Sequence, residues 1–100
     1  MVIAYLKGEV DLSNAQAVKS ELFDAVPNTA SSLVLDLSET KHIDSSGVQL
    51  LFELAHRLGN RGQRLDVIVP DSSLVRRILE LTEVHQVVPL FTSVDAALRG

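Results

Sequence analysis

A cluster of small polar residues stands directly before a helical pattern. Residues 42–51 are HIDSSGVQLL, so Asp44, Ser45, Ser46 and Gly47 precede an apolar run. Two adjacent hydroxyls at such a point can cap a helix, act as the nucleophile of a hydrolase, or accept a phosphoryl group. Each of these chemistries makes different demands on the surrounding residues.

The capping interpretation requires only local residues. Ser46 and Gln49 match the S-x-x-Q capping box, in which the hydroxyl accepts a hydrogen bond from a free backbone N–H of the first turn. An N-cap of this kind contributes about 1 kcal/mol. Gly47 would then only allow close packing. This interpretation gives the serine pair a structural role, and the local sequence leaves it open.

The hydrolase interpretation fits less well. A nucleophile elbow has the pattern G-x-S-x-G, and Asp44 stands where its first glycine belongs. The chain has three histidines, His42, His56 and His85, and none is at a spacing that forces it next to Ser46. A chain of 100 residues also leaves little room for a substrate pocket. We therefore expect no enzymatic activity.

A phosphoacceptor aspartate is a further alternative. Receiver domains place aspartates at the C-terminal ends of strands, where they hold Mg²⁺, and Asp11, Asp36 and Asp44 could imitate that arrangement. However, Asp36 falls inside a predicted strand, no adjacent acidic pair follows the first strand, and a fifth strand–helix unit is missing. Asp11 and Asp44 can equally stabilise turns and helix starts. We expect no metal site and no cofactor.

Phosphorylation would exploit the same physics as a cap. A phosphoserine carries about −1.5 to −2 charges, and a helix N-terminus offers free N–H groups and the positive end of the helix dipole. The fold would therefore tolerate a phosphate on Ser46. The phosphate would change the charge and shape of an exposed acidic rim, which is what a switch that turns off a protein contact requires.

Length and composition limit the class of protein. The 100 residues predict one domain, residues 1–100, and 46% hydrophobic residues predict a real core. The net charge of −4, the absence of a basic run and only four aromatic residues argue against nucleic-acid binding. No apolar stretch approaches the about 20 residues of a membrane span, and we expect no secretion because the sequence does not open with a basic and then apolar stretch. We expect a cytoplasmic domain without disulfides, since it has no cysteine.

Apolar runs alternate with helical patterns along the chain. This alternation is typical of an α/β domain with a small, mostly parallel or mixed sheet and right-handed crossovers. Strands are predicted at 2–6, 33–37 and 65–69, with a weaker fourth at 87–91 that contains Pro89. Four helices are predicted. The first, 13–26, has Ser13 and Gln16 as its capping box, and the second is 46–58. The third runs from the cap Asp71 to Leu81, and a short fourth helix follows the cap Thr92. The residues of the third helix that are expected to face the core are Leu74, Val75, Ile78 and Leu81.

The segments 8–14 and 38–46 are predicted to be loops at one edge of the sheet, because the C-terminal ends of parallel strands gather there. At 100° per residue, the core stripe of the helix at 46–58 centres on Leu51. Leu50 flanks that stripe and is expected to be an exposed apolar anchor for a partner. The predicted docking surface is the rim around Ser46: Glu9, Asp11, Asp44, Ser45, Gly47, Gln49, Leu50 and Glu53.

Three segments resemble the STAS domain, specifically the bacterial anti-sigma factor antagonists. They are KGEVDLSNA at 7–15, LVLDLSETKHIDSSGVQLL at 33–51 and VRRILELTEV at 75–84. The resemblance covers nearly the whole chain in the same order. The G-E-hydrophobic-D segment is weakly specific by itself, but its combination with I-D-S-S-G at this spacing is quite specific.

The resemblance implies a phosphoswitch. In that family the unphosphorylated antagonist binds an anti-sigma factor that is also a serine kinase, and so releases the sigma factor. The kinase phosphorylates the serine directly before the glycine, which is Ser46 here with Ser45 as the second choice, and a metal-dependent phosphatase of the PP2C type reverses the reaction. By the same resemblance Asp44 and Ser45 would orient the acceptor, Gly47 would let the partner approach, and Asp11 matches the acidic residue near the site.

Two departures from the family pattern stand out. Family members usually have a further strand before the one predicted at 2–6, and this sequence starts too late to include it. Glu83 stands where many relatives have a helix-ending glycine, which bears on the local turn. STAS domains also serve as subunits of transporters and stress-signalling assemblies, so an unswitched subunit of that kind is the alternative function. We expect a monomer or weak dimer.

Overall fold

Short runs of branched apolar residues form a central parallel sheet in the computed structural model, which describes residues 1–99. Its strands are β1 (Val2–Tyr5), β3 (Ser32–Asp36), β5 (Arg64–Ile68) and β6 (Leu90–Phe91). They lie in the order β1-β3-β5-β6, and all three neighbouring pairs are parallel. The four predicted strands and the α/β class are therefore confirmed.

A second, two-stranded parallel sheet lies where loops were predicted. β2 (Gly8–Val10) pairs with β4 (Thr40–Ile43), and Val10 is in register with Ile43. The Thr40 hydroxyl donates to the Leu6 carbonyl oxygen at 2.7 Å and ties this pair to the end of β1. The loop prediction for these residues is wrong, because strands this short have no periodicity to detect. The pairing places the residues that follow β2 next to those that follow β4.

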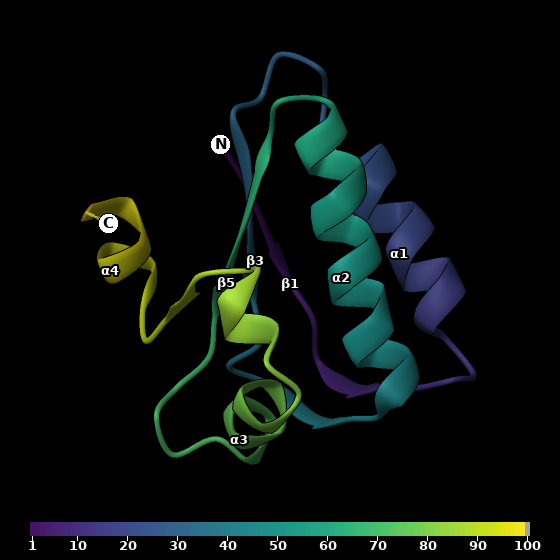
Figure 1. Cartoon of the computed structure of the whole chain (residues 1–100), viewed down its shortest axis with the longest axis vertical. Helices are drawn as coiled ribbons and strands as arrows, with labels where there is room; N and C mark the ends of the chain where they lie inside the picture. Colours follow the sequence, from purple (N-terminus) through teal and green to yellow (C-terminus); the bar gives the residue numbers. More distant parts are fainter. Residues whose placement is uncertain (100) are drawn as a thin grey trace.

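Within residues 1–99, α-helices lie on both faces of the central sheet. Figure 1 shows α1 (Ala15–Asp24) and α2 (Ser45–Asn60) side by side on one face of the central sheet. The short α4 (Val94–Arg99) lies on the other face, and α3 (Leu74–Leu81) packs against β4. A 3₁₀ turn, η1 (Val84–Gln86), follows α3. Because α1 and α2 both follow strands of the β2–β4 pair, their N-terminal ends lie close together.

The helices begin one or two residues away from the predicted caps. The residue before α1 is Asn14 rather than Ser13, and its side chain forms no cap hydrogen bond. α3 is capped by Ser73 rather than Asp71, because Ser73 has the extended backbone that a cap needs and its hydroxyl accepts from Val75 and Arg76. At α4, the hydroxyl of Ser93 rather than that of Thr92 accepts from the Ala96 N–H.

The core lies between the central sheet and the layer formed by α1, α2 and α3. The inner residues of the sheet, such as Leu33 and Leu35, pack against Leu51 and Leu54 of α2, and all four are at most 1% exposed. α3 contributes Val75 and Leu79. The predicted inward positions Leu74 and Leu81 are wrong, since both are more than two thirds exposed. This helix packs at the end of the sheet, so only a narrow stripe of its surface is covered.

Candidate functional site

Asp44 is the N-cap of α2. Its backbone is extended, and its Oδ1 accepts hydrogen bonds from the N–H groups of Ser46 at 2.8 Å and Gly47 at 3.2 Å. The predicted capping box of Ser46 and Gln49 is therefore wrong, because the cap lies two residues earlier. Ser46 occupies the second position of α2, and its hydroxyl is not needed to cap the N-terminus of the helix.

The same carboxylate joins two segments that are distant in the sequence. Its second oxygen, Oδ2, accepts from the backbone N–H of Leu12 at 3.2 Å, and the Asp44 N–H donates to the Val10 carbonyl oxygen at 3.2 Å. The prediction that the segments 8–14 and 38–46 meet at one edge is confirmed. Asp44 holds the β2–α1 connection against the start of α2.

The β2–α1 connection is a turn built on Asp11. The Asp11 carboxylate accepts from both the backbone N–H and the hydroxyl of Ser13, and these bonds hold the pKa of Asp11 below its usual value. The Asn14 side chain accepts from the Asp11 N–H at 3.0 Å and donates to the Glu9 carbonyl oxygen at 2.8 Å. The turn holds Leu12 at its tip, with 81% of that residue exposed.

The two serines lie in different surroundings. Ser45 is exposed at the first position of α2, whereas Ser46 is half-buried and lines a pocket between α1 and α2. Within residues 1–99, neither the Ser45 hydroxyl nor the Ser46 hydroxyl has a hydrogen-bond partner. The pocket has a volume of about 170 Å³ and is lined by Leu12, Ala15, Gln16, Lys19, Ser46, Gln49, Leu50 and Glu53.

An ion pair crosses this pocket. Lys19 of α1 and Glu53 of α2 are joined by a hydrogen-bonded contact of 3.2 Å between Nζ and Oε2. The Lys19 side chain is only 13% exposed, and that of Glu53 is 41% exposed. Glu53 was predicted to line the rim of the site, and Lys19 was missed. An isolated lysine in an amphipathic helix carries no sequence signal for such a contact.

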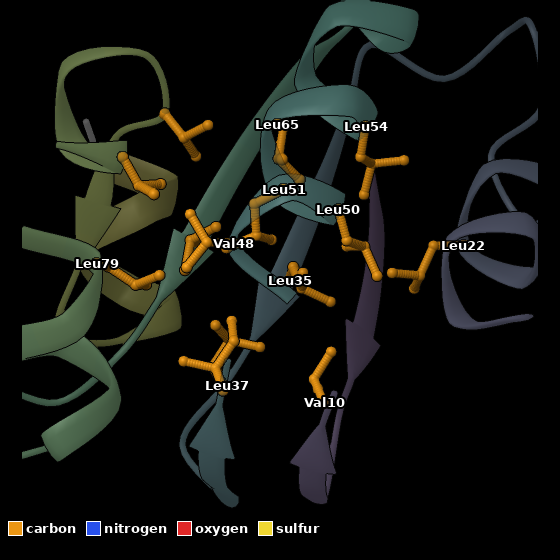
Figure 2. Packing of buried hydrophobic residues seen from close by; sticks show 14 of the residues in the cluster. Val10, Leu22, Leu35, Leu37, Val48, Leu50, Leu51, Leu54, Leu65 and Leu79 are labelled. Carbon is orange, nitrogen blue, oxygen red and sulfur yellow. The ribbon is translucent and has the colours of Figure 1, made fainter. Parts of the chain in front are cut away.

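Leu50 is buried rather than exposed. It is 2% exposed and belongs to the main core cluster. Figure 2 shows its side chain directed toward Leu22 of α1. The expectation of an exposed anchor at Leu50 is wrong, because α1 covers the side of α2 that flanks the Leu51 stripe. The exposed apolar residue at this site is Leu12. Its position between the polar residues Asp11 and Ser13 in a predicted loop was the sequence signal that could have indicated its exposure.

Gly47 is required by packing inside the molecule. A Cβ atom on this residue would lie 2.4 Å from Ile43 Cγ1 and 2.9 Å from the Val10 carbonyl oxygen. Gly47 is buried, and its burial contradicts the expected role of admitting a partner. The close approach that it permits is that of α2 to the β2–β4 pair, which sets the position of Ser46.

The remaining predicted rim residues lie around the pocket and the Asp11 turn. Glu9 and Gln49 are exposed, and Asp11 and Asp44 are half-buried. In residues 1–99, no three histidine or acidic side chains are grouped so that they could hold a metal ion. No helix in the same range is long and apolar enough to span a membrane.

Comparison with known proteins identifies the relatives of this chain. The STAS domain model matches residues 1–97. The anti-sigma-F factor antagonist RsfB of Mycobacterium tuberculosis is 26% identical over 100 residues, which cover all of this chain and 80% of RsfB. BtrV of Bordetella bronchiseptica, whose name marks it as a candidate anti-sigma factor antagonist, is 30% identical over 97 residues, which cover 97% of this chain and 83% of BtrV.

A solved structure has the same fold. The crystal structure of an anti-sigma factor antagonist from Mycobacterium paratuberculosis superimposes with a TM-score of 0.83 at 27% sequence identity. The superposition covers 97% of this chain and 81% of that protein.

Proposed function

This chain belongs to the STAS domain family, and on that basis we propose that it is an anti-sigma factor antagonist switched by phosphorylation of Ser46. In the proposed cycle the unphosphorylated protein binds an anti-sigma factor that is also a serine kinase, and the sigma factor is released. Phosphorylation ends the binding. The protein itself acts as ligand and substrate in the cytoplasm, not as an enzyme.

The observation that carries the proposal is the placement of Ser46. Asp44 supplies the cap of α2, so the Ser46 hydroxyl has no structural task there. Ser46 lies at the N-terminus of α2 and lines a pocket together with the exposed Leu12. A phosphoryl group at this position alters the surface without removing an interaction that the fold needs.

The chemistry of the switch is a phosphoryl transfer from ATP. The kinase moves the γ-phosphoryl group to Ser46 Oγ, the hydroxyl proton passes to a base of the kinase, and ADP leaves. A PP2C-type phosphatase transfers the group to water and restores the hydroxyl. Both catalytic machineries belong to the partners, and this chain contributes only the acceptor and its surroundings.

The docking surface combines an apolar tip with an acidic rim. Leu12 replaces Leu50 as the expected anchor, because interface energy concentrates in a few side chains that lose their water on binding. Around it lie the exposed or half-buried residues of the predicted rim: Glu9, Asp11, Asp44, Ser45, Gln49 and Glu53. A phosphate on Ser46 adds negative charge to this rim and opposes docking by a partner that accommodates the unmodified face.

The direct test is phosphorylation by a kinase-type anti-sigma factor from the same organism. The wild type, Ser46→Ala and Ser45→Ala are incubated with the kinase and ATP, and phosphopeptides are mapped by mass spectrometry. Phosphate should appear on Ser46 in the wild type, vanish in Ser46→Ala, and persist at a reduced rate in Ser45→Ala. Phosphate on Ser45 in the wild type would overturn the assignment, and a chain that binds but is never phosphorylated would be an unswitched STAS subunit.

A further inference from the structure

One face of α2 connects the phosphoacceptor to the ion pair in the pocket. Gln49 and Leu50 lie three and four residues after Ser46, Glu53 lies four and three residues after them, and all four residues line the same pocket. Across the pocket, α1 contributes Lys19. Among the lining residues Lys19 is the only cation and Glu53 the only anion.

The surroundings of Ser46 otherwise disfavour a phosphate. The backbone N–H groups of Ser46 and Gly47, which a helix N-terminus usually offers to an anion, already bind the Asp44 carboxylate. Asp44 itself adds a negative charge two residues away. A phosphate that remains in the pocket therefore needs a cation, and the pocket supplies one in Lys19.

We propose that Lys19 exchanges partners when Ser46 is phosphorylated: it pairs with Glu53 in the unmodified protein and with the phosphate in the modified protein. This inference rests on the proposed function, since it takes Ser46 as the acceptor. The pocket of about 170 Å³ is more than ten times the roughly 10–15 Å³ that holds one water molecule on the same measure, so a phosphoryl group can enter it.

The exchange is favoured by charge. The phosphate carries about −1.5 to −2 charges against −1 for a carboxylate, and Lys19 is largely shielded from water, which strengthens its interactions. Glu53 is 41% exposed, so it can return to solvent at little cost. The lysine stem is flexible and carries its three donors to either partner.

The consequence is a change at two points of the docking surface. The phosphate and Lys19 fill the pocket beside Ser46, and Glu53 presents a free carboxylate seven residues further along α2, about 10 Å along the helix axis. A partner that docks across this face of α2 meets a closed pocket and one more unpaired acid. Phosphorylation therefore changes more of the surface than the serine itself.

The experiment uses the full chain with phosphoserine installed at position 46 during translation, so no kinase is required. The second ionisation of the phosphate is followed by ³¹P NMR. A nearby cation favours the dianion, so Lys19→Met should raise this phosphate pKa by about 1. Glu53→Gln removes the competing partner and should lower it. Lys7→Met is the matched control, because Lys7 also pairs with a glutamate, Glu39, but does not line the pocket.

An unchanged phosphate pKa in Lys19→Met, or an equal rise in Lys7→Met, would overturn the inference. Lys19→Gln, which keeps a polar side chain of similar length, replaces Lys19→Met if that variant does not fold, and the same rise is expected. Because the phosphate is installed without a kinase, a negative result here leaves the kinase assay of the proposed function unaffected. A kinase that ignores Ser46 would in turn reject the proposed function without changing the NMR result.

Discussion

Asp44 and Leu12 are 32 residues apart in the sequence and share a hydrogen bond, in which Asp44 Oδ2 accepts from the Leu12 N–H at 3.2 Å. The other oxygen of this carboxylate caps α2. One side chain thus fixes both the tip of the β2–α1 turn and the start of the helix that carries Ser46. The two halves of the proposed docking surface keep their relative position because of it.

Asp44→Ala should lower the free energy of unfolding by about 1–2 kcal/mol, since the helix loses its cap and the Leu12 N–H loses its acceptor. Chemical denaturation measures this loss. Asp44→Asn separates the two roles: its single oxygen still caps the helix, but its NH2 group cannot accept from the Leu12 N–H, so it should recover only part of the stability. Equal stability of Asp44→Ala and the wild type would show that the carboxylate does not hold the two segments together.

Leu12→Arg should weaken binding of the anti-sigma factor at least tenfold while leaving the melting temperature nearly unchanged, because Leu12 is exposed at the site. Titration calorimetry and thermal unfolding measure the two effects. Leu98→Arg is the matched control, since Leu98 is exposed on α4, on the other face of the sheet. Loss of binding in both variants would contradict the assignment of the docking surface.

Leu50→Ala should lower the free energy of unfolding by about 2–5 kcal/mol, as expected for a buried leucine truncated to alanine. Leu51→Ala should show the same profile, because both residues lie in the core cluster. Denaturation of the two variants side by side is the measurement. A stable Leu50→Ala variant would mean that α1 does not cover this side of α2.

Gly47→Ala should destabilise the protein by roughly 1–3 kcal/mol, because the added methyl group meets Ile43 and the Val10 backbone. Gly59→Ala is the matched control on the same helix. Nothing lies within 4 Å of a Cβ at Gly59, so alanine there should stabilise α2 by about 0.5–1 kcal/mol. The two substitutions should therefore shift the denaturation midpoint in opposite directions, and a shift in the same direction would contradict the tight fit at Gly47.

Glu83→Gly should stabilise the protein by roughly 1 kcal/mol. Glu83 follows α3 with φ of 64°, a left-handed conformation that costs a residue with a side chain about 1–2 kcal/mol. The turn after α3 is thus formed with strain. Glu83→Ala is the control, because it removes the charge but keeps the strain, and it should show no comparable gain in melting temperature.

The Asp11 turn should lose stability in acid. The pKa of Asp11 is lowered in the folded protein. The carboxylate therefore contributes fully to stability above its ordinary pKa of 3.8, and this contribution is lost as the pH falls through the lower folded value. Carboxyl NMR should place the titration of Asp11 below that ordinary value. Asp11→Asn should flatten the acid limb of the stability curve, and an unchanged limb would show that the Ser13 hydrogen bonds do not persist in solution.

Local patterns in the sequence were sufficient to predict the strands of the central sheet and the position of α2. The apolar runs at 2–6, 33–37 and 65–69 become strands of the parallel sheet, because short runs rich in Val, Ile and Leu are typical of buried strands. The position of α2 followed from its apolar period. The meeting of the two segments that carry Asp11 and Asp44 followed from the parallel order of the strands alone.

Only the tertiary structure decided which residues face solvent at the site. Leu50 is buried because α1 packs beside α2, and no period within α2 contains that information. The β2–β4 pair forms because two segments about 30 residues apart meet, and strands of three and four residues show no local alternation. Lys19 and Glu53 likewise form their ion pair only because α1 packs against α2. The sequence by itself determined where the proposed acceptor serine lies along the chain, and the contacts between distant segments determined what surrounds it.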